Sequence, residues 1–393
     1  MPETRAAPVP DVVAAAMRLA DTVRGARREA EQARRTPAWL ADAIGRAGLY
    51  QLYLPRALGG PETPPLVGFR AIEELSRADG AVGWCAMIAS IMASHLAKLP
   101  IEVGLELAGI PADYRASGPG GPTAGRAWPV AGGWRVSGQW NFASGIDNAR
   151  WLYCTCIVMD GDTPRMTEAG KPMLRMVWVP RDAVTIVDTW SVMGMRGTGS
   201  QDFTVEDVFV PDRRSIASDA QPVLPGALYH PRSLVTIQWT LTVANALGIA
   251  RGAIDNLVAL AGTEASTLNT ALLRDRPMVQ ARIGEAEAMV NAARAYVFDA
   301  VGRLWDELCT GAAPSDRAVA QARLAIVHAM HEATRAVDKV FHAAGTNAIY
   351  TDLPLEACFR DIHVAVQHGA ALPGYFESAG KVLLGLRPAD PGW

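Results

Sequence analysis

A serine at the end of a strand-like stretch is the first residue whose surroundings suggest chemistry. Residues 134–142 alternate apolar side chains, among them Trp140 and Phe142, with polar ones, which is the period of a half-buried strand. The stretch ends at Ser144 and Gly145, where small residues let the backbone approach a flat ligand. Aromatic side chains beside a hydroxyl suit a planar heteroaromatic ring with one polar edge atom. For the strand alone, an ordinary sheet face with a polar turn is the simpler interpretation.

A glycine-rich loop supplies further hydrogen-bond donors. Residues 193–202 read MGMRGTGSQD, and a strand-like run follows them. The glycines allow close backbone approach, and Arg196, Thr198 and Ser200 carry donors that could meet an anion. Taken alone, such a loop has low specificity for function.

Two histidines near the carboxyl end need separate treatment. His363 and His368 are five residues apart in a run that we expect to be helical, so their side chains would point about 140° apart. They therefore do not share a face, and no HExxH pattern accompanies them, so we expect no metal site. A hydrogen-bonded structural histidine is the simpler interpretation of each.

Hydrophobic periodicity divides the chain into three parts, which we expect to be domains. Residues 1–111 show helical spacing, residues 112–215 show short strands, and residues 216–393 show long helices joined by short breaks. Residues 81–99 are apolar nearly all round and predict a helix in the interior. The fold class is therefore α+β, with an amino-terminal helical domain, a middle β-barrel or sandwich, and a carboxyl-terminal four-helix bundle.

The composition of the chain limits which classes of partner it can bind and indicates its cellular compartment. The net charge of −3, without a basic cluster, argues against nucleic acid or an anionic membrane as a partner. The amino terminus lacks the apolar core of a signal peptide, and the five cysteines match no disulfide or metal framework. We expect reduced thiols in a cytoplasmic protein.

Five motifs in this order resemble the acyl-CoA dehydrogenase superfamily over nearly the whole chain. They are DGAVGW (79–84), WNFASG (140–145), GMRGTGSQD with the strand to VFVP (194–211), ALGIARG (246–252) and FRDIH (359–363). The resemblance is closer to the flavin-dependent monooxygenases of that fold (group D), the two-component hydroxylases that take reduced flavin from a separate NAD(P)H:flavin reductase.

The residues favour the monooxygenase branch over the dehydrogenases. A dehydrogenase of this family needs a carboxylate base against the flavin. One of the two positions that carry it holds Gln367, His368 and Gly369, and the other lies within residues 231–252, which contain no Asp or Glu. Gln238 stands near that second position, and a histidine stands where similar monooxygenases carry theirs.

The resemblance implies a role for each candidate residue. Reduced flavin (FADH2 or FMNH2) would react with O2 to a C4a-hydroperoxide, with Ser144 at flavin N5 and His368 either deprotonating the substrate or hydrogen-bonding the peroxide. The ring would be sheltered by Trp140 and Phe142. The substrate pocket would be lined by Trp84, His95, Gln238 and Trp239, although His95 is equally well explained as a hydrogen-bonded core histidine.

The flavin phosphate would be bound by several residues from two subunits. Within one chain the candidates are Arg196, Thr198 and Ser200. Arg276 and Gly345 would come from a neighbouring subunit of a homotetramer or dimer, because RPMVQ and AAGT resemble the interface elements of the family. Gly345 replaces the usual double glycine, which leaves FAD against FMN open.

The sequence therefore predicts an oxidoreductase, a flavoprotein hydroxylase acting on an aromatic or polycyclic small molecule in biosynthesis or catabolism. The candidate pocket is rich in Trp and Met and poor in charge, which suits such a substrate. Three alternatives stay open: an N-oxygenase of an amine or amino sugar, a true dehydrogenase whose base lies elsewhere, and an inactive helical scaffold.

Overall fold

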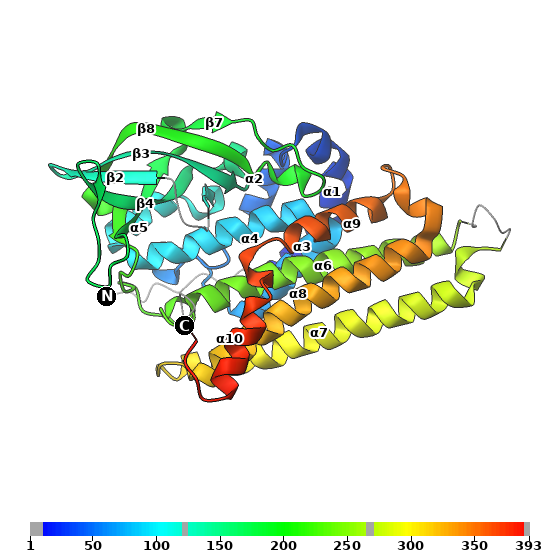
Figure 1. Cartoon of the computed structure of the whole chain (residues 1–393). Coiled ribbons are helices and arrows are strands. Elements are labelled where there is room, and N and C mark those ends of the chain that lie inside the picture. The colour runs from blue at the N-terminus through cyan, green and yellow to red at the C-terminus, as the bar shows by residue number, and fades with distance from the viewer. Residues whose placement is uncertain (1–10, 120–124, 265–270, 389–393) are drawn as a thin grey trace, which may run out of the picture.

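The chain folds into two helical parts with a sheet between them in sequence. The computed structural model describes residues 11–119, 125–264 and 271–388. The amino-terminal helices are α1 (Val12–Ala33), α2 (Ala38–Arg46), α3 (Pro65–Ala78), α4 (Gly80–Ser94) and α5 (Ile101–Ala108). The carboxyl-terminal helices are α6 (Leu234–Ala261), α7 (Pro277–Cys309), α8 (Asp316–Ala344), α9 (Pro354–Ala365) and α10 (Gly374–Leu383). The predicted order of helical, β and helical parts is confirmed, and α4 lies between the sheet and the long helices (Figure 1).

The β part is a mixed sheet with the strand order β7-β8-β3-β2-β4-β6-β9, and β1 and β5 pair with β4. The strands are β1 (Ala116–Ser117), β2 (Gly125–Val130), β3 (Gly133–Ala143), β4 (Trp151–Asp160), β5 (Thr163–Pro164), β6 (Leu174–Pro180), β7 (Thr185–Val187), β8 (Gln201–Pro211) and β9 (Ser215–Ala217). The strand β9 pairs with β6 and so carries the sheet just past residue 215, where we expected the β domain to end.

An irregularity in β3 changes which aromatic side chains face the core. Pairing of β3 with β8 shifts register between Trp140 and Ala143, and Phe142 has a φ of 59°. Trp140 therefore points into the sheet core, where only 3% of it is exposed, whereas 62% of Phe142 is exposed. The simple alternation that we expected to place both on one face is wrong at Phe142, because a bulge shifts the period by one residue.

The apolar helix expected at residues 81–99 is confirmed as an interior element. Asp79 caps α4, since its Oδ1 accepts a hydrogen bond from Val82 N (2.9 Å). Within α4 every residue is buried except Trp84 and Ile88, and a 3-10 turn at His95–Lys98 follows. The segments Gly80–Lys98 and Leu234–Ala261 are long and apolar enough to span a membrane, yet both are mostly buried in this fold.

Two glycines of the ALGIARG motif let α6 pack directly against the backbone of α3. A Cβ at Gly248 would lie 2.5 Å from Glu73 O, and one at Gly252 would lie 2.6 Å from Arg77 O. Contacts this short with a carbonyl exclude any side chain unless the helices move apart. The two glycines of the motif are thus required for close packing of α6 on α3, and the motif needs no ligand to explain it.

We expect Gly248→Ala to lower the free energy of unfolding by about 1–3 kcal/mol, the usual cost of overpacking a core. Urea unfolding followed by tryptophan fluorescence measures it. The matched control is Gly284→Ala in α7, where the added Cβ would have no neighbour within 4 Å and where alanine favours the helix. A Gly248→Ala protein as stable as this control would contradict the packing argument.

Candidate active site

Ser144 lies at the centre of a cluster of polar groups where β3 ends. Its Oγ accepts a hydrogen bond from Trp84 Nε1 (3.1 Å) and lies 2.7 Å from Ser200 Oγ. The carbonyl of Ser144 accepts a bond from Ser117 Oγ (2.7 Å), and the next N–H, that of Gly145, donates to Thr198 O (2.8 Å). The motifs around Trp84, Ser144 and Ser200, distant in sequence, therefore meet in one place.

His368 reaches the same place from the carboxyl-terminal part. Its ring packs edge-on against Trp84, with centroids 5.5 Å apart and planes at 81°. We expected the helix to extend to His368, and this prediction is wrong. The helix α9 ends at Ala365, and His368 instead caps a short 3-10 turn. His363 remains on α9 and pairs with Asp338 (3.0 Å), so the two histidines have separate surroundings.

The protonation of His368 differs from the near-neutral titration expected of a histidine. Burial lowers the pKa of His368 to about 4, so the ring is neutral at pH 7. Its Nδ1 accepts a hydrogen bond from Ala370 N (3.2 Å), and an accepting nitrogen carries no proton. The single ring proton therefore lies on Nε2, which makes that atom a hydrogen-bond donor.

Carboxylates take no part in this cluster. In the described part of the chain, no hydrogen bond or ion pair joins an Asp or Glu to Trp84, Ser144 or His368. The first acid of α6 is Asp255, and it is paired with Arg77 (2.5 Å) and Arg251 (3.3 Å). The geometry thus offers an imidazole and a hydroxyl, without the base that a dehydrogenase needs.

A second cluster of polar side chains, formed by Ser94, His95 and Gln238, lies at the end of α4. Ser94 Oγ donates to Ile91 O (2.6 Å), so it must accept from Gln238 Nε2 (2.9 Å). The remaining hydrogen on Gln238 Nε2 points to His95 Nε2 (3.3 Å), which places the ring proton of His95 on Nδ1. Burial, with the nearby charge of Lys98, lowers the pKa of His95 to about 3. His95 Nδ1 is buried without a partner, so this group holds an unused donor.

Two expected site residues lie elsewhere. Trp239 follows Gln238 on α6, but its ring packs against Tyr375 of α10 with centroids 4.9 Å apart, because successive helix residues point 100° apart. Trp140 stacks on Phe203 (5.2 Å) and donates to Thr155 O (3.0 Å) inside the sheet core. We therefore remove Trp239 from the pocket and Trp140 from the flavin ring.

Of the residues expected to bind the flavin phosphate, Thr198 and Ser200 are engaged in other hydrogen bonds. Thr198 and Ser200 are buried, and their hydroxyls bond each other (2.7 Å), so neither is free for an anion. Arg196 is exposed, with Nε bonded to Val192 O (3.0 Å). Arg276 precedes α7, and Gly345 follows α8 with a φ of 62°; the neighbouring-subunit role of both stays a prediction.

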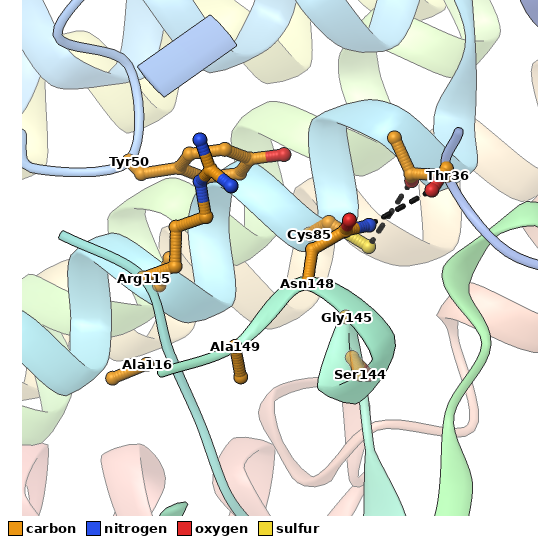
Figure 2. A pocket seen from close by; sticks show the side chains of 10 residues that line it. Thr36, Tyr50, Cys85, Arg115, Ala116, Ser144, Gly145, Asn148 and Ala149 are labelled. Atoms are coloured by element: carbon orange, nitrogen blue, oxygen red, sulfur yellow. Dashed lines mark hydrogen bonds between the residues drawn. The ribbon is translucent and has the colours of Figure 1, made fainter. Parts of the chain in front are cut away.

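A small cavity lies behind Ser144, away from Trp84 and His368. Its volume is about 20 Å³, which holds one water molecule and no flavin. Figure 2 shows Thr36 and Asn148 on its wall, where Asn148 Nδ2 donates to Thr36 O (2.8 Å), and Thr36 Oγ1 donates to Gly197 O (3.1 Å). Sequence reasoning missed both residues, because a single Thr or Asn gives no local signal of contacts more than a hundred positions away.

The buried acid Asp361 holds the loop that precedes Thr198, and a second buried acid, Asp79, lines the same cavity. Asp361 Oδ1 accepts a hydrogen bond from Met195 N (2.5 Å), and Met195 has a φ of 56°, which non-glycine residues rarely adopt. Asp79 and Asp361 line a common cavity of about 10 Å³. Burial raises the pKa of Asp79 to about 6 and that of Asp361 to about 7.

The chain is similar to known protein families along most of its length. Models of the acyl-CoA dehydrogenase N-terminal and C-terminal domains match residues 12–100 and 240–373. Indole-3-acetate monooxygenase of Pseudomonas putida is 31% identical over 90% of this chain and 88% of its own length. The FADH2-dependent resorcinol hydroxylase oxygenase component of Rhizobium sp. (strain MTP-10005) is 33% identical over 70% of this chain and 68% of its own.

A solved structure has the same fold along the full length. The crystal structure of 3-HSA hydroxylase from Rhodococcus sp. RHA1 superposes with a TM-score of 0.86 and 28% identity, covering 98% of this chain and 99% of that one. The expected fold, with helical, β and helical parts, is confirmed. The chain belongs to the acyl-CoA dehydrogenase superfamily, in its branch of flavin-dependent monooxygenases.

Proposed function

We propose that this protein is the oxygenase component of a two-component monooxygenase, which uses reduced flavin and O2 to hydroxylate an aromatic or polycyclic small molecule. The observation that carries the proposal is the contact of Trp84, Ser144 and His368 in a cluster to which no described carboxylate is bonded. The similarity to indole-3-acetate monooxygenase and to the FADH2-dependent resorcinol hydroxylase supports it.

The residues around Ser144 fit a flavin ring. Phe142 presents an apolar side chain of which 62% is exposed, beside a hydroxyl that retains an unused lone pair. Reduced flavin, when bound, would supply the electrons that activate O2. The chain itself would hold the polar N5 edge at Ser144 Oγ, cover the ring with Phe142 and keep water away with Trp84 and its neighbours.

His368 would act as a hydrogen-bond donor rather than as a base. Its Nδ1 is occupied by Ala370 N–H, and its low pKa keeps the ring neutral, so Nε2–H is the atom available to an oxygen of the substrate or of the activated O2. A fixed donor in an enclosed site stabilises negative charge that develops on oxygen.

The substrate would lie along α4. Trp84 and Ile88 are the residues of α4 that keep accessible surface, and His95 follows eleven positions after Trp84, about 16 Å along a helix and on the same side. This line is apolar except for the His95 and Gln238 pair, which would orient a polar substituent. A neutral His95 suits an uncharged oxygen better than a carboxylate.

The proposed assembly is a homotetramer in which neighbouring subunits share the flavin phosphate. Arg196 would meet the flavin phosphate, with Arg276 and Gly345 of a neighbouring subunit. Apolar side chains are exposed between α8 and α9 and around α10, namely Ile349, Tyr350, Phe376 and Leu384, and they suit subunit contacts in a homotetramer. A separate reductase would supply reduced flavin. We propose that the protein is cytoplasmic, where its cysteines would stay reduced. We keep 1–111, 112–215 and 216–393 as the proposed domains.

The test mixes the protein anaerobically with reduced FMN or FAD, adds O2, and follows hydrogen peroxide with a peroxidase-coupled dye. We expect the protein to slow peroxide release relative to free reduced flavin, and to form hydroxylated product from an uncharged aromatic probe such as resorcinol.

We expect Ser144→Ala to raise peroxide release by about tenfold, since one buried hydrogen bond is worth about 1 kcal/mol or more. Peroxide release from the wild-type protein as fast as that of free reduced flavin, without product, would contradict the proposed function. A dehydrogenase would instead reduce added oxidised flavin with an acyl substrate and need no O2.

A further inference from the structure

Three buried hydroxyls form a continuous chain that ends at a backbone carbonyl. Ser144 Oγ lies 2.7 Å from Ser200 Oγ, which lies 2.7 Å from Thr198 Oγ1. Thr198 Oγ1 in turn donates to Met195 O (2.8 Å). Only 1% of Thr198 and 3% of Ser200 is exposed, so solvent cannot replace any link.

The carbonyl at the end fixes the direction of every hydrogen bond in this hydroxyl chain. A carbonyl oxygen only accepts, so the single hydroxyl proton of Thr198 is committed to Met195 O. Thr198 can then only accept from Ser200, and Ser200, its proton committed, can only accept from Ser144. The proton of Ser144 is therefore directed away from the cluster with Trp84. Trp84 Nε1–H occupies one lone pair of Ser144 Oγ, which leaves that atom with one lone pair and no proton to donate.

The anchor of the hydroxyl chain is itself held on both sides. Met195 O also accepts from Trp190 Nε1 (3.1 Å), and Met195 N is bonded to Asp361. Reversing the hydroxyl chain would remove one of the hydrogen bonds that Met195 O accepts and would leave the proton of Ser144 without an acceptor in the protein, which is unfavourable for buried groups. The polarity is thus built into the fold before any ligand binds.

We propose that Thr198 and Ser200 are positioning residues that make Ser144 Oγ an obligate hydrogen-bond acceptor, so that the site selects reduced over oxidised flavin. This inference rests on the proposed function, which places flavin N5 at Ser144. Reduced flavin carries a proton on N5 and can donate to Ser144 Oγ. Oxidised flavin has only a lone pair on N5, which would face the lone pair of Ser144. The same arrangement would release oxidised flavin after turnover.

The test compares dissociation constants of reduced and oxidised FMN and FAD, measured by anaerobic titration. We expect the wild-type protein to bind the reduced form more tightly. In Ser200→Ala the proton of Ser144 loses its acceptor and can turn to N5. In Thr198→Val the proton of Ser200 is freed and the chain can reverse. Both variants should lower the ratio of oxidised to reduced dissociation constants by about tenfold, mainly by tightening the oxidised form.

The control is Thr198→Ser, which keeps the hydroxyl and should keep the wild-type ratio. Circular dichroism and thermal unfolding verify that each variant is folded. An unchanged ratio in Ser200→Ala and Thr198→Val, with both flavins bound, would overturn the proposal and leave the proposed function intact. A wild-type protein that binds neither flavin form would overturn the proposed function together with it.

Discussion

His368→Ala should lower the rate of hydroxylation by about 10²–10³, the effect of removing one fixed donor from an enclosed site. His368→Gln should retain a rate within about tenfold of wild type, because its amide places an N–H near the position of Nε2. Glutamine has no basic nitrogen. The pair of variants therefore separates hydrogen-bond donation from proton abstraction. Single-turnover product formation with reduced flavin and O2 measures both.

The pH dependence gives an independent check on His368. Since burial lowers its pKa to about 4, the ring stays neutral from about pH 5 upward. We therefore expect no loss of the single-turnover rate from His368 between pH 5.5 and 8. A His368→Gln protein as slow as His368→Ala, or a rate that falls with a wild-type pKa near 6.5, would restore the role of base. His363→Ala serves as the matched control, since His363 pairs with Asp338 outside the cluster.

The second large effect is expected at Asp361. Asp361→Ala should lower the free energy of unfolding by about 1.5–3 kcal/mol, because Met195 N loses a buried acceptor. Asp361→Asn keeps an acceptor oxygen of the same shape and should cost less. Urea unfolding of the two variants measures the difference, and equal losses would show that the bond to Met195 contributes nothing.

The two Asp361 variants should also differ from the wild-type protein in how stability depends on pH. Burial, with the charge of Asp79, raises the pKa of Asp361 to about 7, above its ordinary value of 3.8, while Met195 N–H and Arg360 oppose the shift. A carboxyl group whose pKa is raised by folding contributes fully to the free energy of unfolding below about pH 4, and this contribution is lost as the pH rises towards 7. Asparagine does not titrate. The unfolding free energy of Asp361→Asn, relative to that of wild type, should therefore rise by about 1–3 kcal/mol as the pH is raised from 5 to 8.

Asp79 titrates in the same direction and is present in all of these proteins. Burial raises its pKa to about 6, and its charge also raises the pKa of Asp361, so the difference between Asp361→Asn and wild type at each pH includes the interaction of the two acids. A difference in unfolding free energy that stays constant from pH 5 to pH 8 would contradict the raised pKa of Asp361.

The sequence predicted the elements that pattern determines and failed where tertiary pairing determines the detail. The interior position of α4 followed from its apolar surface, and the family motifs indicated that Trp84 and Ser144 serve the same site. The outward turn of Phe142 could not be predicted, because the bulge exists only in the pairing of β3 with β8. The sequence also could not show which of Gln238 and Trp239 faces the pocket, because the direction of each side chain depends on how α6 is rotated in the bundle.

His368 shows the same limit in its chemistry. The resemblance assigned His368 and Trp84 to one site, and their rings do pack together, but the helix of His368 was predicted too long, and its pKa was taken as that of a free histidine. Burial lowers that pKa, and the bond from Ala370 N sets the tautomer. Both effects come from atoms brought together by folding. The commitment of Thr198 and Ser200 to a buried chain, where we expected phosphate contacts, has the same origin.

Trp84, Ser144 and His368 come from the first, middle and last parts of the chain, and this has a consequence during synthesis. A nascent polypeptide that has emerged only as far as the sheet lacks the imidazole, so it cannot assemble the cluster. Under the proposed function, a ribosome-bound or truncated product would lack the hydrogen-bond donor that acts on substrate or activated O2. Efficient hydroxylation would therefore require that the carboxyl-terminal part, which carries His368, has docked on Trp84.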